Sequence, residues 1–194
     1  MNWIWFVASY LLGSLSPGTY LAKAAGVDIQ KSGSGNPGAT NALRTAGWKV
    51  GLSVLFLDAF KGFLPVFLCL RWGPASFSPW VGLAAILGHN WSALLKLRGG
   101  KGMATSLGVM IALSPLTALI LFGIWLLILL LSRYVSLASI VAGLFAGPVL
   151  YWAGKPKGYV IMGVIASLLI VYRHRSNISR LIAGTEYRFG EKAK

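Results

Sequence analysis

Long stretches of apolar residues constrain this chain more than any other feature of its sequence. A helix that crosses a bilayer needs about 20 mostly apolar residues, because the hydrocarbon core is roughly 30 Å thick and each residue adds about 1.5 Å. Hydrophobic residue types fill 56% of the 194 positions and charged types only 11%. The sequence therefore predicts an all-α, polytopic integral membrane bundle that forms one domain over residues 1–194. The candidate spans are residues 3–22, 50–70, 80–97, 136–154 and 159–172.

The apolar run 103–132 forms either one tilted span or two helices that break near Ser114 and Pro115. One span would leave nine Lys and Arg residues on one side of the membrane and eight on the other. Two segments give fourteen against three, with Lys61 inside the membrane. Because cytoplasmic loops carry an excess of Lys and Arg, we predict two segments and about seven in total, including a short one at 103–113. The N-terminus is then outside and the C-terminus cytoplasmic.

The strong positive charge of the chain, formally +14, raises the question of nucleic-acid binding. Nucleic-acid-binding domains need a soluble surface rich in Lys and Arg, and long stretches of this chain have none, so we expect no nucleic-acid partner. The single cysteine, Cys69, excludes a disulfide framework. The sequence also lacks the cluster of Cys and His residues that would predict a metal site.

Four polar segments meet on the cytoplasmic side in this arrangement. The first two are rich in glycine and carry a cation, which is typical of loops that turn backbone N–H groups toward an anion. In the second, Gly100, Lys101 and Gly102 precede an apolar helix, so the positive helix end and the Lys ammonium should face the same ligand. Small residues that only allow close helix packing are the alternative explanation. The segments are SGSGNPGATNALR (32–44), LRGGKGMATSLG (97–108), RYVSLAS (133–139) and YRHRSNISRL (172–181).

Neither glycine-rich segment fits a nucleotide-binding motif. Gly33, Gly35 and Gly38 match G-x-G-x-x-G, but that fingerprint follows a β-strand, whereas a membrane helix comes before it here. The GGKG stretch lacks the spacing of a Walker motif and the hydroxyl after its lysine. We therefore expect no nucleoside triphosphate and no cofactor.

Three further sets of polar residues have two possible roles each. Ser136 and Ser139 begin a helix, where capping or packing competes with ligand binding. His174 lies between two arginines and is either a surface residue of a basic collar or part of the site. Within the membrane, Asp58 and Lys61 share a helix face, which favours a structural ion pair over a proton relay, and His89 is first a packing or hydrogen-bonding residue.

An anion site at the membrane surface suits an enzyme that joins a phosphorylated substrate to a lipid, or a transporter of organic phosphate. Transporters usually bind near the bilayer midplane between repeats, whereas these candidates lie at one surface and no internal repeat is detectable. We therefore favour an enzyme, with the transporter and a noncatalytic scaffold as alternatives. Since no carboxylate pair or Ser-His-Asp arrangement is visible, catalysis would depend on positioning and electrostatics.

The four motifs SGSGNPGATN, GGKGMATSLG, RYVSLAS and YRHRSNISR together resemble the bacterial acyl-phosphate-dependent glycerol-3-phosphate acyltransferases, along nearly the whole chain. The resemblance implies transfer of an acyl group from acyl phosphate to the 1-hydroxyl of glycerol 3-phosphate in the bacterial cytoplasmic membrane. The products would be lysophosphatidic acid and phosphate. It also implies that acyl-CoA is not the donor.

The resemblance also suggests residue roles. Ser34, Arg44 and Lys101 would contact substrate phosphate, while Ser139, His174 and Asn177 would complete a polar pocket on the cytoplasmic face. Thr40 and Asn41 would shape the first loop, and Glu186 would pair with nearby arginines and hold the pocket closed. The full substrate-binding set is Ser34, Thr40, Asn41, Arg44, Gly100, Lys101, Gly102, Ser139, His174 and Asn177, and His174, Lys101 and Asn177 are the catalytic candidates.

A direct attack by the glycerol hydroxyl on acyl phosphate needs no acyl-enzyme, because phosphate is already a good leaving group. The hydroxyl proton would go either to His174 or to the substrate's own phosphate, whose second pKa is about 6. Cations around His174 should weaken its basicity. We therefore favour substrate assistance.

Overall fold

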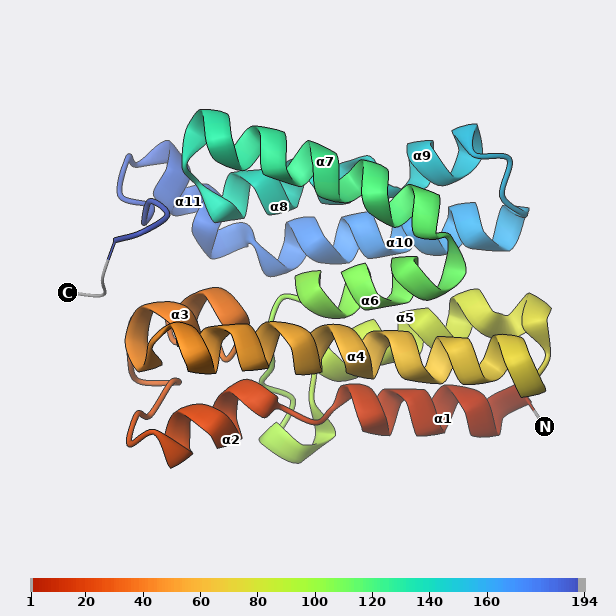
Figure 1. Ribbon diagram of the computed structural model, residues 1–194, viewed down its shortest axis with the longest axis horizontal. Helices are drawn as coiled ribbons and strands as arrows, with labels where there is room; N and C mark the ends of the chain where they lie inside the picture. The colour runs from red at the N-terminus through yellow and green to blue at the C-terminus, as the bar shows by residue number, and fades with distance from the viewer. Residues whose placement is uncertain (1, 192–194) are drawn as a thin grey trace.

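The computed structural model describes residues 2–191, and within that range the chain is built from helices and loops without a β-strand (Figure 1). The helices are α1 (Asn2–Gly13), α2 (Pro17–Ala24), α3 (Ala39–Ala46), α4 (Trp48–Trp72), α5 (Ser78–Asn90), α6 (Met103–Leu113), α7 (Pro115–Ser132), α8 (Val135–Leu144), α9 (Ala146–Trp152), α10 (Lys157–Arg173) and α11 (Arg175–Ile182). Two short 3-10 turns, Ala75–Phe77 and Ala93–Leu95, lie before and after α5.

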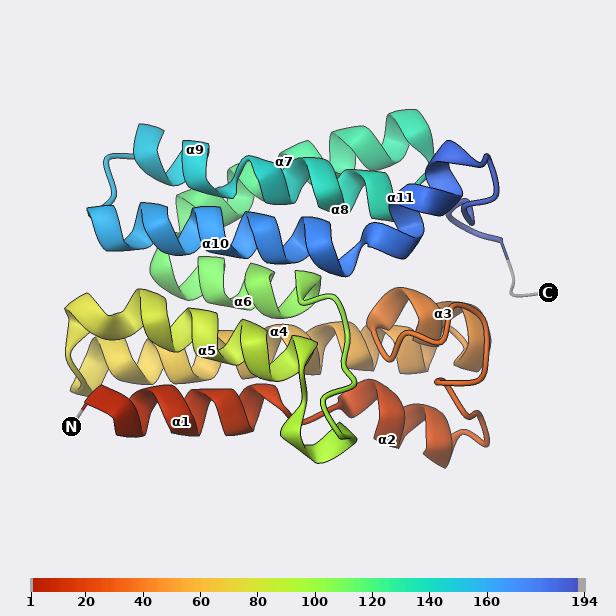
Figure 2. The same cartoon turned by 180° about the vertical axis from the view of Figure 1, so that it is seen from behind.

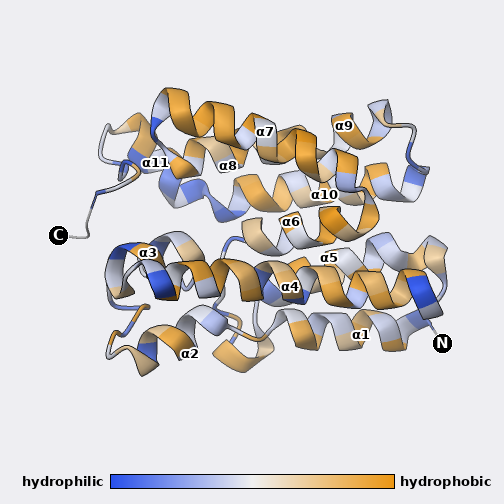
Figure 3. Ribbon diagram, in the orientation of Figure 1, coloured by the Kyte–Doolittle hydropathy of each residue, from blue (hydrophilic) through white to orange (hydrophobic). Residues whose placement is uncertain are grey.

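The long helices run along the longest axis of the molecule, with α1, α4 and α5 on one side, α7, α8 and α10 on the other, and α6 between them (Figures 1 and 2). The short helices α2, α3 and α11 gather at one end, beside the C-terminus, while the N-terminus lies at the opposite end. Hydrophilic residues are concentrated at the ends of the bundle, and apolar residues cover the lengths of helices such as α7 (Figure 3). This pattern matches an apolar solvent around the middle of the bundle.

The predicted break near Ser114 is confirmed, because α6 ends before this residue and Pro115 begins α7. Proline has no N–H to continue the hydrogen bonds of α6 but fits the first position of a new helix. The Ser114 and Thr117 hydroxyls lie 2.8 Å apart at the junction. The run 103–132 is therefore two helices that lie in opposite directions.

Three other predicted spans are less regular than expected. The segment 3–22 is interrupted between α1 and α2, where Pro17 starts a new helix. The segment 80–97 leaves the helix at Asn90, and Lys96 and Leu97 adopt left-handed backbone angles in the loop. The segment 136–154 bends by 40° between α8 and α9.

Within residues 2–191, α4 and α7 are each long and apolar enough to cross a membrane. Counting the bent pairs α8 with α9 and α10 with α11 as single spans brings the number to four. The shorter helix α6, of 11 residues, is apolar but packs inside the bundle. This is the environment in which a short segment is tolerated at membrane depth.

The helices α4 and α6 pack closely through two glycines. A Cβ atom at Gly62 of α4 would overlap the backbone carbonyl of Thr105, and one at Gly108 of α6 would overlap the carbonyl of Ala59. Small residues allow membrane helices to approach at backbone distance. We call this contact the α4–α6 seam, and it fixes the position of the loop that precedes α6.

Candidate functional site

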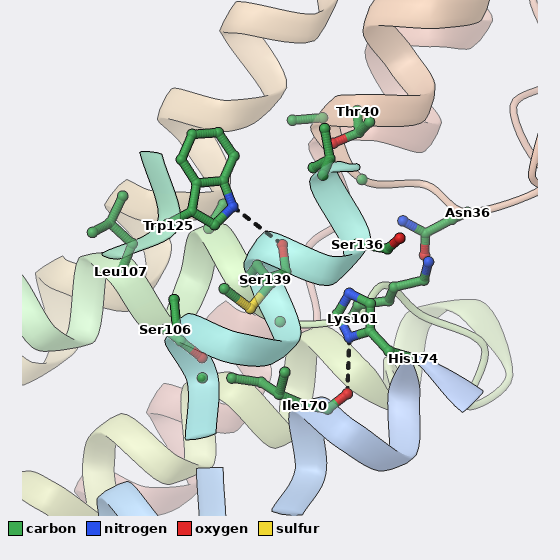
Figure 4. Close-up of a pocket in the computed structure, with 18 of the residues that line it drawn as sticks. Asn36, Thr40, Lys101, Ser106, Leu107, Trp125, Ser136, Ser139, Ile170 and His174 are labelled. Atoms are coloured by element: carbon green, nitrogen blue, oxygen red, sulfur yellow. Dashed lines mark hydrogen bonds between the residues drawn. The ribbon is translucent and has the colours of Figure 1, made fainter. Parts of the chain in front are cut away.

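A cavity of about 450 Å³ opens between the two sides of the bundle, near the end that carries α3 and α11 (Figure 4). One part of its wall is polar and includes two cations, Arg44 and Lys101, with a third, Arg180, on α11. The other part is apolar and lies among α6, α7, α8 and α10. Its polar lining includes Ser34, Thr40, Asn41, Arg44, Lys101, Ser136, Ser139, His174, Asn177, Arg180 and Glu186, and its apolar lining includes Leu107, Met110, Leu121, Phe122, Trp125 and Ile170.

Lys101 extends from the loop before α6 and donates a hydrogen bond to Asn177 Oδ1 on α11. Burial lowers the pKa of Lys101 to about 8, although the carboxylate of Glu186 works against this shift. Arg173 holds the loop from the other side, since its Nε and Nη2 donate to the carbonyls of Gly100 (2.9 Å) and Gly99 (2.7 Å). The ammonium is therefore held at the cavity wall, with little water around it.

Gly99 and Gly100 of the GGKG stretch allow close packing against the end of α5, instead of forming the anion-binding loop expected from the sequence. A Cβ at Gly99 would overlap the backbone of His89 and Asn90, and a Cβ at Gly100 would overlap the His89 imidazole. The Gly100 N–H donates to the His89 carbonyl at 3.0 Å, so it is not free for an anion. Gly100 does not line the cavity, whereas Gly102, with a φ of 82°, does.

The first motif forms a loop whose shape depends on Asn41. The Asn41 amide accepts the Ser34 N–H at 3.0 Å and donates to the carbonyls of Ser32 (3.0 Å) and Ile29 (3.3 Å). This agrees with the expectation that Asn41 shapes the loop. Ser34 is thereby fixed at the cavity wall, next to the start of α3.

Arg44, in the last turn of α3, contacts the C-terminal tail at the cavity wall. Its guanidinium carbon lies 4.3 Å from the centre of the Tyr187 ring, and its Nε donates to the Glu191 carbonyl at 3.3 Å. Cation–π stacking of this kind holds the side chain while leaving guanidinium donors available. The sequence motifs do not identify Tyr187, because this residue lies outside all four of them.

His174 is buried at the bend between α10 and α11, not exposed in a basic collar. Its Nδ1 lies 2.8 Å from the Ile170 carbonyl (Figure 4), so Nδ1 carries the proton in the neutral ring and Nε2 is the free acceptor. Burial, together with the positive charge of Lys101, lowers the pKa of His174 to about 4. The ring is therefore neutral at pH 7.

Glu186 joins the tail to α8 and α11. Its Oε1 accepts hydrogen bonds from Ser136 Oγ at 2.8 Å and Asn177 Nδ2 at 2.6 Å, and its Oε2 accepts one from Arg180 Nε at 2.7 Å. The predicted pairing of Glu186 with an arginine is present. Arg180 was not singled out from the sequence, although its position three residues after Asn177 places both on one face of a helix.

Ser139 lies between the two parts of the cavity, where its Oγ accepts a hydrogen bond from Trp125 Nε1 at 3.3 Å (Figure 4). Thr40 also faces the cavity, from α3. The structure thus brings together side chains from segments far apart in the sequence. Among the ten predicted substrate-binding residues, only Gly100 is absent from the cavity lining.

The buried polar residues of the membrane region form a cluster next to the cavity. Lys61 Nζ lies 2.7 Å from Asp58 Oδ1, with 5% and 3% of the respective side chains exposed, which confirms the expected ion pair. His89 Nδ1 lies 3.4 Å from the same oxygen. Asp58 and His89 also line the cavity.

Comparison with known proteins gives a consistent result. The family model described as glycerol-3-phosphate acyltransferase matches residues 3–184. The glycerol-3-phosphate acyltransferase of Aquifex aeolicus is 46% identical over 94% of this chain and 96% of its own length. That of Thermus thermophilus is 44% identical over 98% of this chain and 97% of its own length.

Solved structures agree with these relatives. The crystal structure of PlsY, an integral membrane glycerol 3-phosphate acyltransferase, in its glycerol 3-phosphate form has a TM-score of 0.93 and 46% identity, covering 97% of this chain and 96% of that one. The lysophosphatidic acid form has a TM-score of 0.91 and 45% identity, covering 97% and 95%. The chain therefore belongs to the glycerol-3-phosphate acyltransferase family of integral membrane enzymes.

Proposed function

We propose that this enzyme transfers a fatty acyl group from acyl phosphate to the sn-1 hydroxyl of glycerol 3-phosphate, as a single domain in the bacterial cytoplasmic membrane. The observation that supports this most is the division of one cavity into a cationic part and an apolar part. The cationic part suits the two phosphates of the reactants, and the apolar part suits an acyl chain. The products are lysophosphatidic acid and inorganic phosphate.

The cations have two tasks in this proposal. Arg44 and Lys101 hold the phosphate groups and stabilise charge on the departing phosphate, with Ser34 as a further donor. Ser139 and Asn177 orient the reacting groups at the boundary between the two parts of the cavity. Thr40, Gly102 and Asn41 contribute through the two loops. Glu186 fixes Asn177 and Arg180 so that they need not reorganise during the reaction.

The chemical step is a direct acyl transfer. The sn-1 hydroxyl oxygen attacks the carbonyl carbon of acyl phosphate, the bond from that carbon to the phosphate oxygen breaks, and phosphate leaves with the bonding electrons. The hydroxyl proton passes to a phosphate oxygen of glycerol 3-phosphate, a phosphate monoester whose second pKa is about 6. His174, with a pKa of about 4, is a weaker base than that phosphate and instead offers Nε2 as a hydrogen-bond acceptor.

We further propose seven membrane segments formed by α1, α4, α5, α6, α7, the pair α8–α9, and α10. Their alternating directions and the opposite placement of the termini support this number. The excess of Lys and Arg at the end that carries α3 and α11 favours a cytoplasmic location for that end and for the active site.

The decisive experiment assays purified protein with glycerol 3-phosphate and either acyl phosphate or acyl-CoA, and detects lysophosphatidic acid. We expect product from acyl phosphate alone. Product from acyl-CoA at an equal rate would overturn the proposed donor. Flux of glycerol 3-phosphate into sealed vesicles without product would instead indicate the organic-phosphate transporter.

A further inference from the structure

The C-terminal end of α5 supports the loop that carries Lys101. Gly99 lies against the His89 backbone, and Gly100 lies against the His89 imidazole. A Cβ at Gly102 would lie 2.8 Å from Asn90 Oδ1. The Gly100 N–H is tied to the His89 carbonyl at 3.0 Å. The last two residues of α5 therefore form the surface against which the GGKG stretch is placed.

His89 is itself held by groups on other helices. Only 8% of the residue is exposed, and its Nδ1 lies 3.4 Å from Asp58 Oδ1 on α4. Asp58 is in turn paired with Lys61, which donates to the Leu15 carbonyl at 2.6 Å in the break between α1 and α2. The buried carboxylate beside Nδ1 restricts how the imidazole can be oriented.

A chain of contacts thus runs from the α1–α2 break to the active site. Asp58 lies 3.4 Å from His89, His89 fills the space that Gly100 leaves open, and the residue after Gly100, Lys101, donates to Asn177. The Nε2 edge of the ring lies against the Gly100 backbone, so the imidazole is placed to support the loop. In acyl transfer, a shift of about 1 Å in such a charged group can cost roughly 100-fold in rate.

We propose that His89 and Asp58 are positioning residues that set the location of the Lys101 ammonium in the cavity. The proposal rests on the proposed function of Lys101 as a phosphate ligand. It assigns a role to a buried cluster that lies next to the proposed phosphate ligands. It also explains why Gly100 must be glycine although it does not line the cavity.

The test is a double-mutant cycle between residues 89 and 100. Gly100→Ala should lower kcat/KM for glycerol 3-phosphate by about 10- to 100-fold, because the new methyl group collides with the imidazole, and His89→Ala should lower it by a similar factor because the loop loses its support. The double variant should be no less active than His89→Ala alone, since the collision is gone. Losses that multiply in the double variant would overturn the proposal.

Two further measurements separate positioning from loss of folding and from chemistry. Ser9→Ala removes another buried contact to α5, the 2.7 Å hydrogen bond from Ser9 Oγ to the Val81 carbonyl. This control should keep full activity, with a melting temperature comparable to that of His89→Ala. Calorimetric titration with glycerol 3-phosphate, which needs no acyl donor, should show weaker binding in His89→Ala. Unchanged binding with a lost kcat would overturn positioning, whereas an inactive wild type that still binds the ligand would instead contradict the proposed donor.

Discussion

Lys101 and Asn177, 76 positions apart in the sequence, are joined by a direct side-chain hydrogen bond at the wall of the cavity. The contact joins the loop before α6 to helix α11 across the two sides of the bundle. Asn177 also donates to Glu186, which in turn accepts from Arg180. A cation, an amide and a carboxylate therefore share one network, and disturbing any member should affect phosphate binding.

Replacing Lys101 with Met should raise the KM for glycerol 3-phosphate by more than about tenfold, because the charge-assisted bond that we propose between this lysine and phosphate is lost, worth about 1.5–3 kcal/mol. Steady-state kinetics with acyl phosphate measure this change. Lys96→Met is the matched control, since Lys96 lies exposed in the same loop and outside the cavity. Equal kinetics in the two variants would remove Lys101 from the site.

The pKa of Lys101, about 8, predicts a pH dependence of substrate capture. The ammonium is present below this pKa and is lost above it, so kcat/KM for glycerol 3-phosphate should fall as the pH rises through about 8. Arginine stays protonated throughout this range, so Lys101→Arg should move the alkaline decline upward while altering the absolute rate. A decline at the same pH in both enzymes would assign it to another group.

Replacing His174 with Gln should leave a substantial kcat, because a group with a pKa of about 4 is not the main base at pH 7. The activity of the unmodified enzyme should rise between about pH 5 and 7 as the phosphate of glycerol 3-phosphate ionises near 6, and this rise should persist in the variant. If both His174→Gln and His174→Ala instead lose turnover while keeping their affinity for glycerol 3-phosphate, His174 is the base and substrate assistance is wrong.

Replacing Glu186 with Ala should lower kcat/KM by about tenfold or more, because three hydrogen bonds to buried or half-buried partners lose their acceptor. Glu191→Ala is the control, since this exposed carboxylate accepts only the Arg188 N–H within the described tail. Kinetics and melting temperatures of both variants would be compared. Similar activities would show that the tail does not organise the cavity.

Cysteine accessibility should report the orientation of the bundle. After the buried Cys69 is replaced by Ala, single cysteines at Lys31 and Lys157, both exposed, would be labelled in intact cells with a membrane-impermeant reagent. We expect labelling at residue 157 and none at residue 31 until the membrane is opened. Labelling of both from outside would contradict the proposed topology.

The helical class and the break at Ser114 could be predicted from the sequence, because hydrophobic length and the distribution of Lys and Arg depend on composition along the chain. The end of α5 at Asn90 could not, since the left-handed residues Lys96 and Leu97 belong to a turn that only tertiary packing selects. The motifs identified most cavity residues. Tyr187 and the support of Gly100 by His89 depend on contacts between distant segments, which a single sequence does not show.

The α4–α6 seam has a consequence for any screen of random variants of this enzyme. Gly62 and Gly108 each lie against the backbone of the partner helix, so even one added methyl group would displace α6 and, with it, Lys101 in the loop before it. Such a screen would score these two glycines alongside the residues proposed to bind phosphate. Inactive variants would therefore identify positions that hold the helices together as readily as positions that take part in catalysis.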